Sequence, residues 1–176
     1  MKKIVLLLVC LLSTSVIFAQ KFACVDSEYI LNNMPEYKQA QKELEDISIQ
    51  WQKEVESKFL AVDKLYKAFQ AESVLLPDEL KSKKENEIIA SEKEAKELQK
   101  QKFGNNGDLA KKRSELVKPI QDKIYNAIEK IAQEKSYAMV FDKSSGATIL
   151  YVDAKTDISE LILAELGYKV NPKKSK

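Results

Sequence analysis

The sequence has no histidine, and glycine and cysteine are scarce. Histidine is the commonest general base and a frequent metal ligand, so its absence removes serine-histidine and cysteine-histidine catalysis and most zinc chemistry. The glycine cluster at residues 104–107 follows a helical pattern and lacks the lysine and hydroxyl of a phosphate-binding loop. The many carboxylates are typical of solvated helix faces. The sequence therefore predicts no enzyme, no cofactor and no metal.

The N-terminus and the cysteines bear on the compartment. Residues 1–19 combine two lysines, a short apolar run and a more polar stretch ending at Ala19, a pattern typical of a secretory signal peptide cut after that residue. The apolar run is shorter than the roughly 20 residues needed to span a bilayer, which argues against a signal anchor. The mature chain would keep only Cys24, so an intramolecular disulfide is excluded. Its alternating apolar surroundings favour a buried structural thiol.

The charge of the mature chain is balanced. Removing Lys2 and Lys3 with the signal peptide lowers Lys+Arg from 29 to 27, while Asp+Glu stays at 27, so the formal net charge becomes zero. A neutral chain offers no general electrostatic attraction to nucleic acid or to anionic lipid. We therefore expect no nucleic-acid partner and leave membrane association open.

What the sequence does contain is one long apolar stripe. Its positions step by three or four residues, with a period of about 3.56 that lies between the coiled-coil and straight-helix values. This pattern predicts a single amphipathic helix over residues 35–71, with Pro35 in its first turn. A helix of this length needs a partner to cover its stripe. The stripe consists of Tyr37, Ala40, Leu44, Ile47, Trp51, Val55, Phe59, Val62, Tyr66 and Phe69.

The stripe helix is followed by a break and a strongly polar return helix. Residues 73–79 contain Pro77 and predict the tip of a helical hairpin, and the return helix begins near Leu80. Residues 104–107 interrupt the return, as a plain loop in preference to a binding feature. The next helix has Pro119 inside it, which predicts a kink or a new helix start at that position. Its apolar stripe consists of Leu109, Leu116, Ile120, Ile124, Ala127 and Ile131.

The two ends of the mature chain have extended patterns. Residues 21–26, 137–142 and 148–153 are predicted strands, the last two forming a hairpin through residues 143–147. A short helix follows, with a capping box of Thr156 or Asp157 with Glu160, and it ends at Gly167. So few strands cannot make a stable sheet alone, which predicts oligomerisation.

The predicted fold class is α+β: a long α-helical hairpin, or coiled-coil arm, attached to a small β-sheet oligomerisation body with a short C-terminal helix. The expected divisions are a signal peptide at 1–19, a body made of 20–34 and 136–170, an arm at 35–135 and a basic tail at 171–176.

Several segments occur in a characteristic order. Residues 21–26 precede the long hairpin, Lys118-Pro119-Ile120-Gln121 leads to Ile124 and Ile128, and residues 137–142 and Tyr151-Val152-Asp153 come before Asp157-Ile158. In this order the chain resembles the Skp/OmpH family of periplasmic chaperones. The resemblance covers essentially the whole mature chain and is most specific from residue 118 to residue 167.

The resemblance implies a periplasmic homotrimer whose strands assemble a β body and whose helical arms surround a cavity. Members hold unfolded outer-membrane proteins there without ATP. The best-known members are strongly basic whereas this mature chain is neutral, so lipid or lipopolysaccharide binding is not carried over. The assembly residues would be Phe22, Cys24, Tyr137, Met139, Phe141, Ile149 and Tyr151.

The arm offers more apolar surface than its polar return helix can cover near the tip, so some of it is expected to contact a client. For any one residue, burial in the hairpin is the competing interpretation. A second function remains open, an envelope coiled-coil scaffold that binds one fixed protein partner. Gly104, Gly107 and Pro119 are the candidate hinges. The candidate client-binding residues are Leu75 and Leu76 at the tip, with Trp51, Phe59, Leu60, Tyr66 and Phe69.

Overall fold

The computed structural model describes residues 21–146 and 149–169, so the predicted signal peptide and basic tail lie outside the described residues. The described chain divides into two compact units. One, the arm unit, is residues 34–123, and the other, the body unit, joins residues 21–33 to residues 124–169. The structure is mostly helical with a small two-stranded sheet, in agreement with the predicted α+β class. Within the described ranges, no helix is long and apolar enough to cross a membrane.

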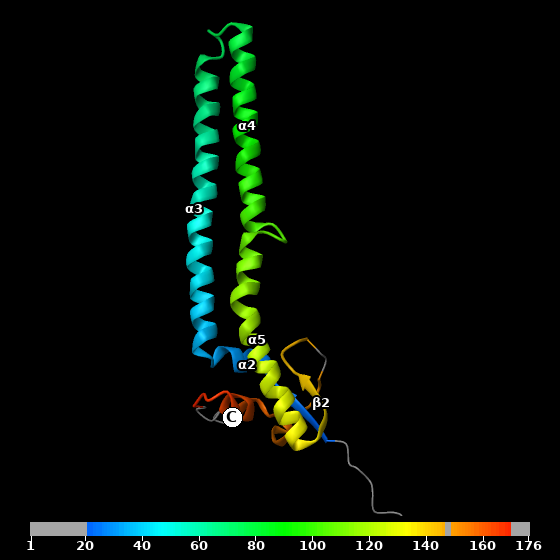
Figure 1. Ribbon diagram of the computed structural model, residues 1–176. Helices are drawn as coiled ribbons and strands as arrows, with labels where there is room; N and C mark the ends of the chain where they lie inside the picture. Colours follow the sequence, from blue (N-terminus) through cyan, green and yellow to red (C-terminus); the bar gives the residue numbers. More distant parts are fainter. Residues whose placement is uncertain (1–20, 147–148, 170–176) are drawn as a thin grey trace, which may run out of the picture. The chain divides into compact units, whose positions relative to one another are not determined.

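The arm unit is a helical hairpin. The long helix predicted from the stripe is α3 (Pro35–Glu72), which has its proline in the first turn. The chain turns through residues 73–77 and returns as α4 (Asp78–Phe103), which lies alongside α3 (Figure 1). A third helix, α5 (Asp108–Lys135), begins in the arm unit and ends in the body unit. The predicted long helix and its return are therefore confirmed.

The buried side chains of the arm lie between its base and its middle. Ala40, Leu44 and Val55 of α3 are buried, together with Ala95 of α4 and Ile120 of α5. Farther out, Tyr66 departs from the buried part of the stripe, because 51% of this residue is exposed while its neighbour Leu65 is half-buried. The two residues are adjacent and both apolar, so a small change in helix rotation decides which one faces the partner helix.

The break in the return is a tight loop. A Cβ added to Gly107 would lie 2.7 Å from the backbone oxygen of Gln101 and 2.9 Å from the backbone nitrogen of Gly104, so the fold requires glycine there. In Figure 1 the loop projects from the side of the arm, and α4 and the first part of α5 continue along the same line. The helix α5 runs through Pro119, so the alternative of a new helix start is wrong.

The sheet of the body unit is parallel. Strands β1 (Lys21–Val25) and β2 (Tyr137–Asp142) pair with each other, so the whole arm is contained in the crossover between them. The predicted hairpin of residues 137–142 with 148–153 is therefore wrong. Residues 149–153 form no strand, and a short 3-10 helix, η1 (Ala154–Thr156), follows them. Asp157 instead bridges to Cys24 of β1.

Two short helices complete the body. The helix α2 (Ser27–Asn32) is capped by Asp26, whose carboxylate accepts a bond of 2.9 Å from the Tyr29 backbone nitrogen. The helix α6 (Ser159–Glu165) begins after Ile158 without a side-chain cap, so the predicted capping box is wrong. Gly167, with φ of +85°, ends α6 as predicted, in a left-handed conformation.

The body core combines residues from both ends of the chain. Apolar side chains of β1, α2, α5 and α6 enclose one another, and α2 packs on α6. This arrangement explains why α5 is amphipathic in its last turns, which lie in the body unit. The buried set is Ala23, Val25, Ile30, Ile124, Ala127, Ile131, Ile158, Ile162 and Leu163.

Candidate functional site

The outer part of the arm, residues 56–94, contains no buried residue. Two facing helices shield only a narrow stripe of each other, and the return helix α4 has few apolar side chains with which to do so. Large apolar side chains therefore remain in contact with solvent. The most exposed are Val74 and Leu75 at the tip, at 87% and 86%.

The predicted client residues fall into two groups. Leu75, Leu60 and Tyr66 are exposed, as a contact surface requires. The other four are half-buried, so their side chains contribute to the hairpin as well as to its surface, and they are Trp51, Phe59, Phe69 and Leu76. Sequence reasoning missed five large exposed apolar side chains of the arm unit, although Val74 precedes Leu75 in the same tip segment. The missed residues are Ile49, Val74, Leu80, Ile89 and Phe103.

Trp51 has a specific structural partner. The ammonium group of Lys102 on α4 lies 4.6 Å from the centre of the indole ring, and it also lies 3.2 Å from a carboxylate oxygen of Asp108 at the start of α5. This arrangement joins α3, α4 and α5 around the glycine loop. Trp51 is therefore better explained by hairpin stability than by client contact.

The assignment of Gly104, Gly107 and Pro119 as hinges stays a prediction.

A second apolar surface lies on the body unit. Phe22 of β1 and Phe141 of β2 are exposed neighbours, with ring centres 6.4 Å apart, and Met139 is exposed on the same strand as Phe141. Beyond the sheet, Leu150 and Tyr151 are exposed at 93% and 83%, although the sequence pattern there is that of a strand. The other predicted assembly residues, Cys24, Tyr137 and Ile149, are half-buried. Cys24 forms no disulfide.

The polar side chains of the body tie its segments together. The ammonium of Lys143 lies 2.6 Å from the Asp157 carboxylate and 3.6 Å from that of Asp26. The buried Ser159 hydroxyl donates to Asp157 at 2.5 Å and accepts a bond of 2.8 Å from the Asp26 backbone nitrogen. These bonds connect the end of β1, the turn after β2 and the start of α6.

The same contacts shift the pKa values of the cluster. Burial alone would raise the pKa of Asp157, but hydrogen bonds from Lys143 and Ser159 outweigh it, so the pKa is lowered. At Asp142 the effect of burial is likewise outweighed by bonds from Ser27 and Ser144, and the pKa is lowered. The hydrogen bond to Asp157 raises the pKa of Lys143. The donors and acceptors satisfy one another, which is typical of a structural network.

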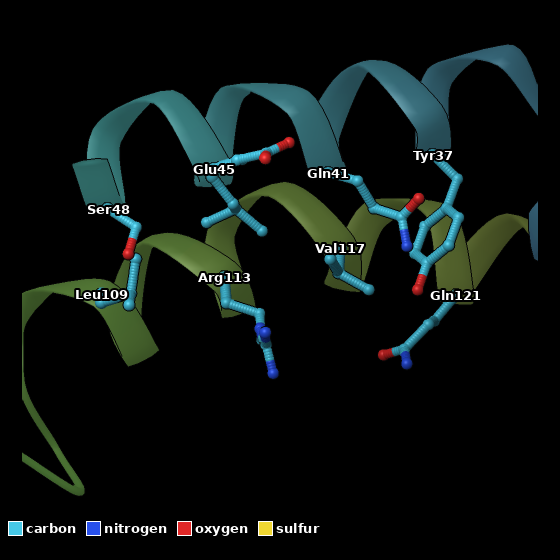
Figure 2. Close-up of a pocket in the computed structure, with 9 residues that line it drawn as sticks. Tyr37, Gln41, Glu45, Ser48, Leu109, Arg113, Val117 and Gln121 are labelled. Carbon is cyan, nitrogen blue, oxygen red and sulfur yellow. The ribbon is translucent and has the colours of Figure 1, made fainter. Parts of the chain in front are cut away.

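The arm unit also contains a groove of about 570 Å³ between α3 and the first part of α5. Figure 2 shows the Tyr37 ring extending from α3 toward α5, and Ser48 facing Leu109 at the other end. The helix α3 approaches α4 closely along their shared length, but it approaches α5 closely at fewer points, which leaves this space open. Its lining mixes apolar side chains with uncharged polar ones and with one charged side chain of each sign. The lining is Tyr37, Gln41, Leu44, Glu45, Ser48, Leu109, Arg113, Val117 and Gln121.

Comparison with known proteins identifies the family to which this architecture belongs. A family model described as outer membrane protein (OmpH-like) matches residues 21–166, which include both strands and all the helices described above. The chain belongs to the OmpH-like family. In this OmpH-like chain one crossover connection joins two parallel strands, and the hairpin is its longest part.

Two further proteins are similar to this OmpH-like chain. An uncharacterized protein of Aquifex aeolicus (strain VF5) is 33% identical over 149 residues, which cover 85% of this chain and 87% of that protein. A crystal structure from Caulobacter crescentus CB15, described as a candidate outer membrane chaperone (OmpH-like), has a TM-score of 0.67. It is 13% identical, and the match covers 84% of this chain and 83% of that one, which shows a shared fold.

This OmpH-like chain exposes apolar side chains on both of its units. Within residues 21–146 and 149–169, acidic and thiol side chains form no group of three that would hold a metal ion. The polar cluster around Asp157 is internally satisfied, whereas apolar side chains on the outer arm and on the body remain exposed. The candidate site is therefore an apolar contact surface spread along the arm.

Proposed function

We propose that this OmpH-like protein is an ATP-independent periplasmic holdase chaperone that keeps unfolded outer-membrane β-barrel proteins soluble. The observation that carries the proposal is the outer arm, where none of residues 56–94 is buried and Val74 and Leu75 are almost fully exposed. Exposed apolar side chains separated by charged ones offer many weak contacts that do not depend on one client sequence. The family membership and the chaperone description of the Caulobacter structure support the same role.

The active form in this proposal is a homotrimer that encloses the client between its arms. A two-stranded sheet is marginally stable by itself, and this one exposes Phe22, Met139 and Phe141. Residues 149–153 have a strand-like apolar sequence but no strand partner within the described part of the chain. Pairing with neighbouring copies would cover these groups. Leu150 and Tyr151 would then be covered on assembly, and the outer arm would remain available to the client.

Light scattering tests the proposal. The purified mature protein, measured alone at several concentrations, should scatter as a stable trimer. When an outer-membrane barrel protein is diluted out of urea into its presence, a soluble complex should form without ATP. A wild-type protein that leaves the barrel protein to precipitate would contradict the holdase function, and binding of a single fixed partner would favour the scaffold instead.

A paired variant locates the contact surface. The double change Val74→Ser and Leu75→Ser removes the most exposed apolar side chains and should lower client retention several-fold without changing helix content. The matched control is Asn105→Ser with Asn106→Ser, which alters an exposed polar loop on the same arm. Equal retention by both double variants would show that the tip has no role in binding.

A further inference from the structure

We infer that the groove between α3 and α5 is a binding site for a short extended polypeptide segment, and that a client strand is its occupant. The lining of the groove determines what fits. Its side chains occupy one face of each helix, from Tyr37 to Ser48 on α3 and from Leu109 to Gln121 on α5. At a rise of ~1.5 Å per residue these faces are roughly 16 to 18 Å long. An extended chain rises ~3.3 Å per residue, so about five residues fit along the groove.

The chemistry of the lining selects a peptide over other small ligands. Leu44, Leu109 and Val117 form apolar surface along the groove. Gln41 and Gln121 carry amide groups that both donate and accept hydrogen bonds, which matches the paired N–H and C=O groups of a backbone. A volume of about 570 Å³ is within the roughly 300 to 1,000 Å³ that ligand sites occupy.

The charges of the groove favour a neutral segment. Arg113 and Glu45 lie on opposite helices, so the lining carries one charge of each sign. Ion pairs between Lys112 and Glu43, at 3.4 Å, and between Lys123 and Glu36, at 3.3 Å, join the same two helices. These ion pairs hold the two helices together across the groove, and they do not use the polar side chains that line it. A segment with alternating apolar and uncharged polar residues fits both the apolar and amide groups of the lining and its balanced charge. This alternation is the pattern of a β-barrel strand.

This inference rests on the proposed function for the identity of its occupant, but its test is separate. The probe is an amidated hexapeptide of alternating valine and threonine that carries fluorescein on its N-terminal nitrogen, and its binding is followed by anisotropy. In Ser48→Trp an indole fills one end of the groove, and affinity should fall at least tenfold. The matched control, Gln50→Trp, places the same group on an exposed position of α3 outside both the groove lining and the outer arm, and it should bind as the wild type does.

A second variant guards against a folding defect. Gln121→Leu keeps the side-chain size and removes an amide, so affinity should fall about threefold to tenfold while circular dichroism stays unchanged. Absence of peptide binding by the wild type, or equal binding by Ser48→Trp and Gln50→Trp, would overturn the inference. So would a benzophenone-labelled peptide that cross-links outside the α3 and α5 groove residues, or a groove cross-link that joins two copies of the chain.

The outcomes separate this inference from the proposed function. If the wild type retains an unfolded barrel protein but does not bind the hexapeptide, the holdase function stands and the groove inference fails. If the barrel protein precipitates while the hexapeptide binds and Ser48→Trp weakens it, the groove is a peptide site and the holdase function fails.

Discussion

The body unit and the outer arm, residues 56–94, hold their apolar side chains in opposite ways. The body encloses Ile30, Ile131, Ile162 and Leu163 almost completely, whereas the outer arm has no buried residue. Closely packed interiors specify one geometry, because any displacement loses contacts on every side. A two-helix arm keeps much of its side-chain area in solvent, so it can change its contacts at low energetic cost. The comparison teaches that apolar residues serve folding in the body and surface contact in the arm.

The largest expected effect on the free energy of unfolding comes from replacing an isoleucine by alanine in each of the two regions. Ile162→Ala in the body should lower the free energy of unfolding by about 2 to 5 kcal/mol, because it leaves a cavity in an enclosed core. Ile88→Ala in the outer arm removes a half-buried side chain and should cost about 1 kcal/mol. Ile89→Ala, at an exposed position, is the control and should change little. Urea unfolding followed by circular dichroism at one fixed chain concentration measures all three.

The series has a clear contrary outcome. If Ile88→Ala destabilises the protein as much as Ile162→Ala, the outer arm is enclosed in the assembled protein. The surface argued to contact a client would then be a core between subunits.

A second effect, that of pH, should arise in the body. The pKa values of Asp142 and Asp157 are lowered by folding, so the unfolded chain binds more protons in the acidic range. Their stabilisation is present above the ordinary carboxylate pKa of 3.8 and is lost as pH falls through the lowered values. Folding raises the pKa of Lys143, so the stabilisation from this ammonium group is lost at alkaline pH, as the pH rises above the ordinary lysine pKa of 10.5. Stability should therefore decline below about pH 4.

The measurement compares wild type with Asp157→Asn by urea unfolding at pH 7, 5, 4 and 3. The variant should be less stable at pH 7 and should lose less stability on acidification, because it lacks one of the two shifted carboxylates. Asp122→Asn changes an exposed carboxylate on α5 and serves as the control. An acid profile for Asp157→Asn identical to that of the wild type would show that the cluster does not set the acid response.

The sequence predicted the helices well because their signals are local. The apolar stripe, Pro35 and the glycine cluster each act over a few residues, and α3 and the loop after α4 follow them. Tyr66 and Leu65 show the limit of these local signals, because two adjacent apolar residues both fit the stripe and only packing selects which one is covered. Strand pairing is not local. The sequence showed apolar runs at both ends of the chain, but not that β1 pairs with β2 across the entire arm.

The candidate site was predicted less well, for a related reason. Exposure is a property of the surroundings of a residue, so Leu75 and Leu76 look equivalent in sequence although only Leu75 is largely exposed. Trp51 appeared to be a client residue because nothing in the sequence pairs it with Lys102, about fifty positions away. The groove between α3 and α5 was missed because its two faces come from segments that the sequence separates by the whole hairpin.

The smallest expected effect compares two cross-helix lysines of the arm. Lys102 is mostly buried, contacts the Trp51 ring and pairs with Asp108, whereas Lys58 pairs with Glu94 at 3.7 Å in an exposed position. Lys102→Met should cost about 1 kcal/mol, since it loses a cation–π contact and a shielded ion pair. Lys58→Met should cost less than about 0.5 kcal/mol, because exposed pairs are screened by water.

Trp51 is the single tryptophan of the chain, so its fluorescence reports on the arm during urea unfolding. Lys102→Met should shift the emission of the folded protein as well as the unfolding midpoint, and Lys58→Met should leave both nearly unchanged. Equal small effects would mean that Lys102 does not hold the three helices together at the glycine loop. The arm would then be as weakly packed at the glycine loop as it is at its tip, and only the body unit would have a closely packed interior.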